Sequence, residues 1–514
     1  MASPALPFPR KPQAAAWRVQ STHLLVLVSL SAGAVLWGWI LISGQRPAPA
    51  EKFLVWLGLY GMASACFIFT RVKGNRLRFF DLPVFLTIYF FVRFGLAPLE
   101  FFVDPPSSVS LQDSYGLLLR ALIYVVFGVG IFWLGCSAIR LKQGNGKRPE
   151  AASALSLRGR DYVLVTGSAL YAVGFAAKLY LLSHHLYSFT SSFQAYYQNL
   201  ASAQVLMSAG QFATYGLIIL CIEKYRHPAD RLRSRLFWAV LLSECGWGLI
   251  SGMKSGVIQN FILVAVVSSL VERKFRKGWI VAALAGLILL YPVINSYRSL
   301  IRGSGAQVAS FSSAASVGSE ALARTSQQES GPAGFLESSW NMSAARLDLL
   351  WSFEKVISLG PKTALLQGKE RWWMIPFYPF VPRFIWHSKP ILDKGARLSV
   401  ALGGNDTTSV APTYPGDLYV TYGLTGLAAG MFLLGIVAQW LTRRTTEALD
   451  KRHLFVYAAI FLMVTNMEID SFSYWTSLIK GLAIISFIAF IVYGPRRRIS
   501  QSVLLRKDAA AAQP

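Results

Sequence analysis

"YGLLLRALIYVVFGVGIFWLGCSA", residues 115–138, is an unbroken apolar stretch that carries a single charged side chain, Arg120. About 20 such residues in an α-helix are enough to cross the hydrocarbon core of a bilayer. The whole chain of 514 residues has the same character, since 54% of it is hydrophobic, only 15% is charged and the mean hydropathy is +0.43. These values are too apolar for a soluble protein of this length. The stretch therefore predicts an integral membrane protein.

On both sides of this stretch, further apolar runs are long enough to span a membrane. We expect about twelve transmembrane helices in all, and hence an all-α, polytopic membrane protein. The expected spans lie near residues 23–42, 53–70, 82–99, 115–138, 161–182, 204–222, 236–253, 256–271, 279–295, 413–440, 454–467 and 475–493.

The formal net charge of +25 would point to nucleic acid if the basic residues formed one solvated face. They cluster instead in short loops between the apolar runs, which is the positive-inside pattern of membrane proteins. The charge therefore indicates orientation, excludes a nucleic-acid partner and places both termini in the cytoplasm. The basic loops are residues 71–78, 140–148, 223–235, 272–278, 442–444 and 495–498.

The apolar runs leave one long gap, which we expect to be a large extracytoplasmic loop. Within it, the Ser/Gly/Ala/Gln-rich residues 302–334 cannot bury a core and are expected to be flexible. Residues 335–400 are expected to form a helix on the membrane surface, followed by an aromatic and basic stretch. The parts of the chain are then 1–295 with helices one to nine, 296–411 as the loop, 412–494 with helices ten to twelve, and 495–514 as a basic cytoplasmic tail.

The aromatic and basic stretch is "RWWMIPFYPFVPRFIWHSKPILDKGARL", residues 371–398. Its prolines limit the backbone to extended or turn conformations, so its Trp and Arg side chains would be presented at little entropic cost. Aromatic rings stack on sugar faces, and the Arg fork matches phosphate oxygens. We interpret the stretch as a lid over a lipid-linked sugar pyrophosphate. The alternative is an aromatic belt at the membrane interface, where Trp and Tyr are commonly enriched.

Charged residues also interrupt the apolar runs, and in the expected topology the basic ones lie toward the outer side. A ring of cations at the outer mouth of an apolar bundle would bind phosphate strongly because it is desolvated. The alternative for each cation is snorkelling toward the nearer interface. Glu244 is expected to form a structural ion pair with an intramembrane cation. The cations are Arg93, Arg120, Lys178 and Lys480 in the runs, Lys254 in an outer turn, and Arg298 and Arg302 at the start of the loop.

Motifs for metals and cofactors are absent from the sequence. All four cysteines fall inside apolar runs, so neither a disulfide nor a thiolate metal site is expected. The chain contains no P-loop, no Rossmann glycine fingerprint and no HExxH motif. We therefore expect neither a metal nor a cofactor.

Two neighbouring segments resemble a known family. They are "LLQGKERWWMIPFYPFVPRFIWHSKP" (365–390) and "TSVAPTYPGDLYVTYGLTGLAAGMFLLGIVAQWL" (408–441). They are similar to the O-antigen polymerases of the Wzy type, repeat-unit polymerases whose periplasmic loop often carries a Pro-Arg, aromatic, Lys-Pro block. In that family the block precedes a helix opened by Pro, Gly and an acid. The matching positions are Pro382, Arg383, Trp386, Lys389, Pro390, Pro415, Gly416, Asp417, Tyr419, Tyr422 and Gly423.

The resemblance implies an activity, a place and partners. The chain would polymerise oligosaccharide repeat units, carried on undecaprenyl pyrophosphate, into a surface polysaccharide such as an O-antigen or an exopolysaccharide. It would be a membrane glycosyltransferase of the bacterial inner membrane, acting at the outer face without a cofactor or metal. Its partners would be the lipid-linked oligosaccharides, the membrane lipids, a flippase and a chain-length regulator.

Such a transfer needs fixed cations for the leaving pyrophosphate and a base for the attacking sugar hydroxyl. The candidate bases are His387, Asp417, Glu244 and Glu337, of which we take His387 and Asp417 as catalytic. Asp417 has a second interpretation as the cap of the helix that follows it. The expected substrate-binding residues are Arg93, Arg120, Lys178, Lys254, Arg298, Arg302, Arg371, Trp372, Trp373, Arg383, Trp386, Lys389, Arg397 and Tyr419.

Two other activities remain open from the sequence. An O-antigen ligase transfers the glycan to the lipid A core and shares the large outer loop with its basic residues. A lipid-linked oligosaccharide flippase needs cations along the path through the bilayer, whereas here they gather at the outer end. This placement favours an enzyme that acts at the outer face over a transporter.

Overall fold

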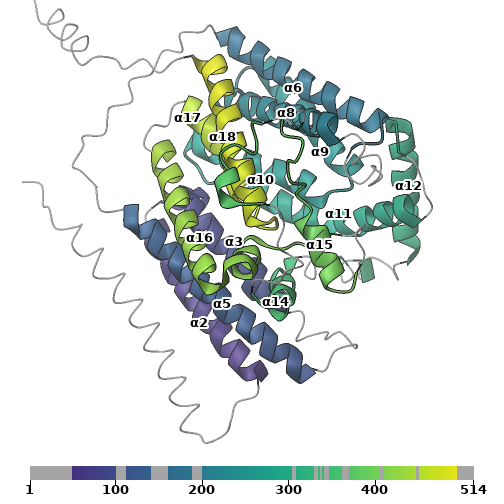
Figure 1. The fold of residues 1–514 in the computed structure, drawn as a ribbon. Coiled ribbons are helices and arrows are strands. Elements are labelled where there is room, and N and C mark those ends of the chain that lie inside the picture. The colour runs from purple at the N-terminus through teal and green to yellow at the C-terminus, as the bar shows by residue number, and fades with distance from the viewer. Residues whose placement is uncertain are drawn as a thin grey trace, which may run out of the picture.

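The computed structural model describes residues 49–73, 75–99, 111–139, 160–187, 200–303, 308–328, 334–335, 339–340, 347–361, 370–381, 383, 385–404, 409–446 and 451–494. These residues form α-helices and short 3-10 and π turns, with no β-strand among them (Figure 1). The longer helices are α2 (Pro49–Val72), α3 (Leu82–Phe91), which π and 3-10 turns extend to Leu99, α5 (Leu111–Ala138), α6 (Arg160–Ser183), α8 (Leu200–Arg226), α9 (Arg231–Ile250), α10 (Lys254–Glu272), α11 (Lys277–Gly303), α12 (Phe311–Gln328), α16 (Tyr414–Thr446), α17 (Lys451–Val464) and α18 (Ser471–Tyr493). Two short helices, α14 (Leu350–Ser358) and α15 (Lys394–Ala401), lie between α12 and α16 in the sequence.

Nine helices in the described part of the chain are long and apolar enough to cross a bilayer. They confirm the expected all-α, multi-pass membrane architecture. Two further expected spans, 236–253 and 454–467, are also helical, as α9 and α17. They fall outside the nine because basic residues crowd the start of α9 and because α17 has only 14 residues. The expected first span, 23–42, lies outside the described residues.

The helices pack as two groups joined by a pair. Helices α2, α3, α5 and α16 form one group and α6 and α8 to α11 form the other, with α17 and α18 in contact with both (Figure 1). The pair therefore determines how the two groups sit against each other.

Polar contacts distinguish the two ends of this bundle. At one end, Arg71 Nη1 donates to Gln439 Oε1 (2.6 Å) and Lys451 Nζ pairs with Glu223 Oε1 (2.6 Å). These contacts bring together basic loops that are far apart in the sequence. The opposite end holds Arg93, whose Nη2 lies 2.8 Å from Glu468 Oε1. Which of the two ends faces the cytoplasm stays a prediction from the charge pattern.

Glycines set the distance between the packed helices. Where α5 crosses α16, a Cβ added to Gly135 would lie 2.2 Å from the carbonyl oxygen of Phe432. Where α6 crosses α8, a Cβ added to Gly174 would lie 2.2 Å from the backbone nitrogen of Ala213. Lipid supplies no hydrophobic driving force between helices, so small residues that let the backbones touch strengthen their packing.

Helix α16 is folded back on itself at Gly423. This residue has φ 69° and ψ −158°, a conformation that is essentially restricted to glycine. The Tyr414 hydroxyl donates to the carbonyl oxygen of Gly430 at 3.1 Å, a separation of 16 residues. A straight helix would hold these two residues about 24 Å apart. We call residues 414–422 the short limb and residues 424–446 the long limb of α16.

The segment between α11 and α16 contains a helix that its composition did not predict. We expected residues 302–334 to be flexible, but residues Phe311–Gln328 form helix α12. Val317 and Ala321 on this helix are buried in a small core with Trp247 and Tyr297. The structure thus has a packed helix where we expected a flexible segment, and the few apolar residues of this helix pack against the bundle.

We predict that Gly423→Ala destabilises the protein by about 1–3 kcal/mol, because a side chain strains the fold-back of α16. Thermal unfolding in detergent measures the effect. Gly58→Ala on α2 is the control, since a Cβ there meets nothing within 4 Å. Equal midpoints for the two variants would show that α16 does not depend on the Gly423 conformation.

We predict that the loop between α11 and α16 faces away from the cytoplasm. Alkaline phosphatase fused after Gly331 should be active, and the same reporter fused after Arg444, beside a basic cluster, should be inactive. Activity at Arg444 and none at Gly331 would invert the topology.

Candidate functional site

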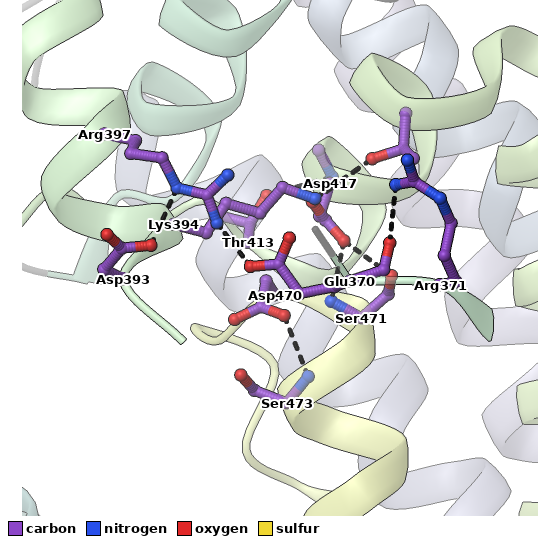
Figure 2. Close-up of polar contacts among 12 residues, drawn as sticks. Glu370, Arg371, Asp393, Lys394, Arg397, Thr413, Asp417, Asp470, Ser471 and Ser473 are labelled. Atoms are coloured by element: carbon purple, nitrogen blue, oxygen red, sulfur yellow. Dashed lines mark hydrogen bonds and ion pairs between the residues drawn. The ribbon is translucent and has the colours of Figure 1, made fainter. Parts of the chain in front are cut away.

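The short limb of α16, the first turn of α18 and the loop residues 370–397 meet at one place, and Figure 2 shows their polar side chains turned toward one another. Thr413 precedes the short limb with a positive φ of 56°. Its hydroxyl accepts from the Gly416 N–H at 3.1 Å and its carbonyl accepts from the Asp417 N–H at 2.9 Å. These bonds satisfy the free N–H groups at the start of α16 and fix the direction of Asp417.

Asp417 is the centre of this place. Its side chain is 1% exposed and forms an ion pair with Lys394. Its Oδ2 also accepts from the backbone N–H of Ser471 at 2.9 Å and from the Ser471 hydroxyl (Figure 2). The carboxylate thus ties α15 and the start of α18 to α16. It holds three elements together and has no open side for a substrate, so our expectation that Asp417 is a catalytic base is not favoured.

Asp470 lies next to this carboxylate and caps α18, because its Oδ1 accepts from the Ser473 N–H at 2.8 Å. Burial, and after it the charge on Asp417, raises the pKa of Asp470 above its ordinary value. The Ser473 hydrogen bond and the charge on Lys394 act in the opposite direction. Two neighbouring buried carboxylates are thus held by helix N-termini and a lysine.

A second ion-pair group lies beside the first. Arg397 Nε lies 2.8 Å from Asp393 Oδ1, and the Arg397 guanidinium also pairs with Glu370 (Figure 2). Arg371 is exposed, and its Nη1 donates to the carbonyl oxygen of Glu370 at 3.1 Å. Arg397 was an expected substrate-binding residue, but its charge is neutralised by two carboxylates of its own chain.

Two more expected anion-binding cations have partners within the chain. Lys178 Nζ lies 2.6 Å from Glu244 Oε1, which is the structural pair we expected for this acid. Arg93 Nη2 lies 2.8 Å from Glu468 Oε1, and its Nε donates to the carbonyl oxygen of Leu347 at 2.6 Å. Both cations join elements of the bundle, so the expectation that they bind substrate is not favoured.

Arg383, Lys389 and Lys480, which we call the cation centre, form no ion pair with a described carboxylate. Lys389 Nζ donates to the carbonyl oxygen of Val381 at 3.0 Å and lies 4.3 Å from the centroid of the Tyr378 ring. Burial, and then the charges on Arg383 and Lys480, lower the pKa of Lys389. The Lys389 ammonium is therefore near enough to both Arg383 and Lys480 to be repelled by their charges.

Donors of the cation centre remain available for a ligand. Arg383 donates from Nη1 to Lys389 O at 2.8 Å and from Nη2 to Pro390 O at 3.0 Å. Its Nε is buried and has no hydrogen-bond partner among the described residues. Lys480 Nζ donates to Ser208 Oγ on α8. A guanidinium has five N–H donors and an ammonium has three, so each cation can still bind an anion.

Tyr378 connects the cation centre to the carboxylate group. Its hydroxyl donates to Pro390 O at 2.8 Å and its ring meets Phe472 of α18 edge-on at 5.2 Å. Burial raises the pKa of Tyr378 to about 12, while the nearby charge on Arg383 lowers it and those on Glu370 and Asp470 raise it. The cations and the carboxylates therefore lie on neighbouring sides of one buried ring.

The remaining expected site residues fall into four groups. Trp372, Trp386 and Tyr419 turn inward against the core, and the Trp372 ring meets Tyr422 at 6.1 Å. Trp373 and His387 are exposed. Arg120 donates to the Tyr124 hydroxyl at 3.0 Å, and Arg298 donates to Gly252 O at 2.6 Å. The side chains of Lys254 and Arg302, and all of Glu337, lie outside the described residues.

Sequence reasoning missed part of this site. Lys480 stood out only as a charge within an apolar run, and nothing marked it as a neighbour of Arg383 and Lys389. Lys394 and Asp470 carried no signal, because charged residues in loops and before helices are ordinary. In the described part of the chain no group of three or more His, Cys, Asp or Glu side chains could hold a metal ion.

A family described as a domain of unknown function (DUF8712) matches residues 169–490, which is more than half of the chain. The chain belongs to this family. The DUF8712 region contains the cation centre and the Asp417 group, whereas Arg93 and Arg120 precede it. No curated protein and no solved structure matches the chain.

We predict that the Lys394–Asp417 pair is coupled. Asp417→Ala leaves a largely buried ammonium without a counter-charge and should destabilise the protein by about 3–5 kcal/mol. The double variant Lys394→Met with Asp417→Leu should regain much of that loss. Thermal unfolding of the single and double variants in detergent measures the coupling.

The exposed Arg324–Glu320 pair on α12 is the matched control, with both side chains 52% exposed. Its removal should change stability by less than about 1 kcal/mol. Additive effects of the two substitutions at Lys394 and Asp417 would contradict a structural role for their ion pair.

Proposed function

We propose that this protein polymerises oligosaccharide repeat units, carried on a polyprenyl pyrophosphate, at the outer face of the bacterial inner membrane. The observation that carries the proposal is the cation centre of Arg383, Lys389 and Lys480. It is an anion site without a described counter-charge, located between a transmembrane helix and an aromatic loop. A pyrophosphate at the head of a membrane lipid fits such a site in charge and in depth. The resemblance of residues 365–390 and 408–441 to Wzy-type polymerases supports the same reaction.

The reaction requires that the donor and acceptor are positioned, that cations stabilise the leaving pyrophosphate and that a base accepts the proton of the acceptor hydroxyl. The bond between the anomeric carbon of the donor glycan and the pyrophosphate oxygen breaks, and the acceptor hydroxyl oxygen bonds to that carbon. The pyrophosphate leaves with the electron pair, and the acceptor proton passes to a base. Fixed cations stabilise the charge that develops on the leaving oxygen without reorganisation. Arg383 is suited to this role because its planar fork matches phosphate oxygens and its charge is permanent.

His387 is the better of the two catalytic candidates. It is exposed, lies two residues from Lys389 and follows Trp386, which packs against the Tyr378 ring at 6.1 Å. In this proposal its imidazole accepts the proton of the acceptor hydroxyl. Asp417, by contrast, is engaged by Lys394 and Ser471, and its role in this proposal is to position the short limb.

The location of the cations favours an enzyme over a flippase. A flippase needs unpaired cations along the whole path of the pyrophosphate, yet Lys178 is paired with Glu244 and the other candidates lie at the loop end. A flippase and a chain-length regulator would then be separate partners. The polysaccharide of a deletion strain separates the remaining activities: single repeats on the lipid indicate a polymerase, and unattached polymer indicates a ligase.

We predict that Lys480→Met shortens or abolishes the polymer while the protein still accumulates in the membrane. Losing one charged hydrogen bond costs about 1.5–3 kcal/mol, or roughly 10- to 100-fold in binding. Lys480 is the sharpest test because Ser208 is its only hydrogen-bond partner among the described residues, so the loop does not depend on it. Lys480→Arg should retain activity, and Arg383→Lys should retain only part of it.

Arg324→Ala removes an exposed cation of the same outer loop and should leave polymer length unchanged. Full-length polymer from Lys480→Met would remove the cation centre from the reaction.

We predict that His387→Ala lowers the polymerisation rate by about 10²–10⁴-fold if His387 is the general base. Polymer formation by membranes supplied with lipid-linked repeat units measures the rate. Ser388→Ala, a neighbouring exposed position, is the control. A normal rate in His387→Ala would move the base to another residue, and Asp417 would be the next to test.

A further inference from the structure

Residues 372–392 form a segment with two faces of opposite character. Its only Lys and Arg residues, Arg383 and Lys389, turn inward to the cation centre. Six of its exposed side chains are large and apolar, and we call them the outward face; Trp373 and Ile385 among them are 66% and 65% exposed, respectively. The polar residues His387 and Ser388 are also exposed. The outward face comprises Trp373, Phe377, Phe380, Ile385, Ile391 and Leu392.

Several backbone polar groups of this segment are satisfied from within it. The carbonyls of Val381, Lys389 and Pro390 accept from Lys389 Nζ, Arg383 and the Tyr378 hydroxyl. Turns close further bonds, such as Phe380 N–H to the carbonyl of Phe377 at 3.0 Å. The prolines bring no N–H that needs an acceptor. Non-helical backbone placed at membrane depth must be satisfied in this way, whereas a loop in water has no such need.

The segment lies beside the points where two spans begin. Tyr378 packs on Phe472 in the first turn of α18, and Trp372 packs on Tyr422 at the fold-back of α16. Just beyond the fold-back, Leu424 on the long limb is 44% exposed. The outward face is therefore continuous with the apolar flank of the bundle.

We propose that the outward face inserts into the membrane leaflet at this end of the bundle, where its partner is the hydrocarbon of membrane lipids. The inserted face would hold the cation centre at the depth of lipid headgroups. A membrane lipid then brings its phosphate to the cations by lateral diffusion, while the hydrocarbon tail of the lipid stays in the bilayer. The insertion stands independently of the polymerase reaction, because it rests on the exposed apolar side chains and on their position beside the starts of α18 and of the long limb of α16.

A nitroxide label on the full chain in phospholipid nanodiscs tests this insertion. Replacing the four free cysteines, Cys66, Cys136, Cys221 and Cys245, with Ala provides the parent protein. Phe377→Cys and Ile385→Cys then carry the label on the outward face, and Ser388→Cys carries it at an exposed polar position of the same segment. Using two outward positions keeps the test valid if one variant does not fold.

The readout is the accessibility of each label to oxygen, which concentrates in hydrocarbon, and to a water-soluble nickel chelate. We expect oxygen accessibility to exceed nickel accessibility at the two outward positions, and the reverse at Ser388→Cys. Nickel accessibility at the outward positions equal to that at Ser388→Cys would overturn the insertion. The insertion would also be overturned if the outward labels moved from nickel-accessible to oxygen-accessible only when farnesyl pyrophosphate is added. The outward face would then be a binding surface for the hydrocarbon tail of the ligand.

Discussion

A charge inside a membrane protein needs a partner, and this requirement organises the whole structure. Lys178 meets Glu244, Arg93 meets Glu468 and Lys394 meets Asp417, and each of these pairs joins elements from distant parts of the chain. The charges that have such partners build the bundle. Arg383, Lys389 and Lys480 of the cation centre form no ion pair with a described carboxylate, and our proposal assigns them to a ligand.

The fold-back of α16 at Gly423 determines where the paired and the unpaired charges lie in the structure. It returns the short limb to the level of the α17–α18 connection, where the Tyr414 N–H donates to the carbonyl of Met467 at 2.9 Å. Asp417 can then reach the N-terminus of α18 and bind Lys394 from the loop. A straight α16 would carry Asp417 away from Ser471. The conformational freedom of one glycine therefore determines whether the carboxylate group and the cation centre become neighbours.

The sequence leaves two alternatives for the aromatic stretch, residues 371–398: a lid over a ligand and an aromatic belt at the membrane interface. In the structure the stretch has features of both. Trp372, Tyr378 and Trp386 turn toward the protein, as a lid over a ligand requires. Trp373 and Phe377 turn outward, as an aromatic belt requires. A segment with both faces can close a site from above and remain in contact with lipid. Its prolines and its internal hydrogen bonds make this arrangement possible without a regular helix.

The sequence by itself determined the all-α membrane architecture, the positions of the spans and the segregation of basic loops, because each follows from local apolar length and local charge. It also pointed to residues 371–398 and to a structural pair for Glu244. It could not show which cations form ion pairs and which do not. Whether Arg397 or Arg383 pairs with a carboxylate depends on which carboxylate the fold brings near. It could not find Lys480 as the third member of the cation centre, which lies 91 positions beyond Lys389 in the chain. Order in α12 was also missed, because a helix with so few apolar residues is stabilised by packing against the bundle. Pairing of charges and burial of a weakly apolar face are long-range effects, and only the tertiary structure decided them.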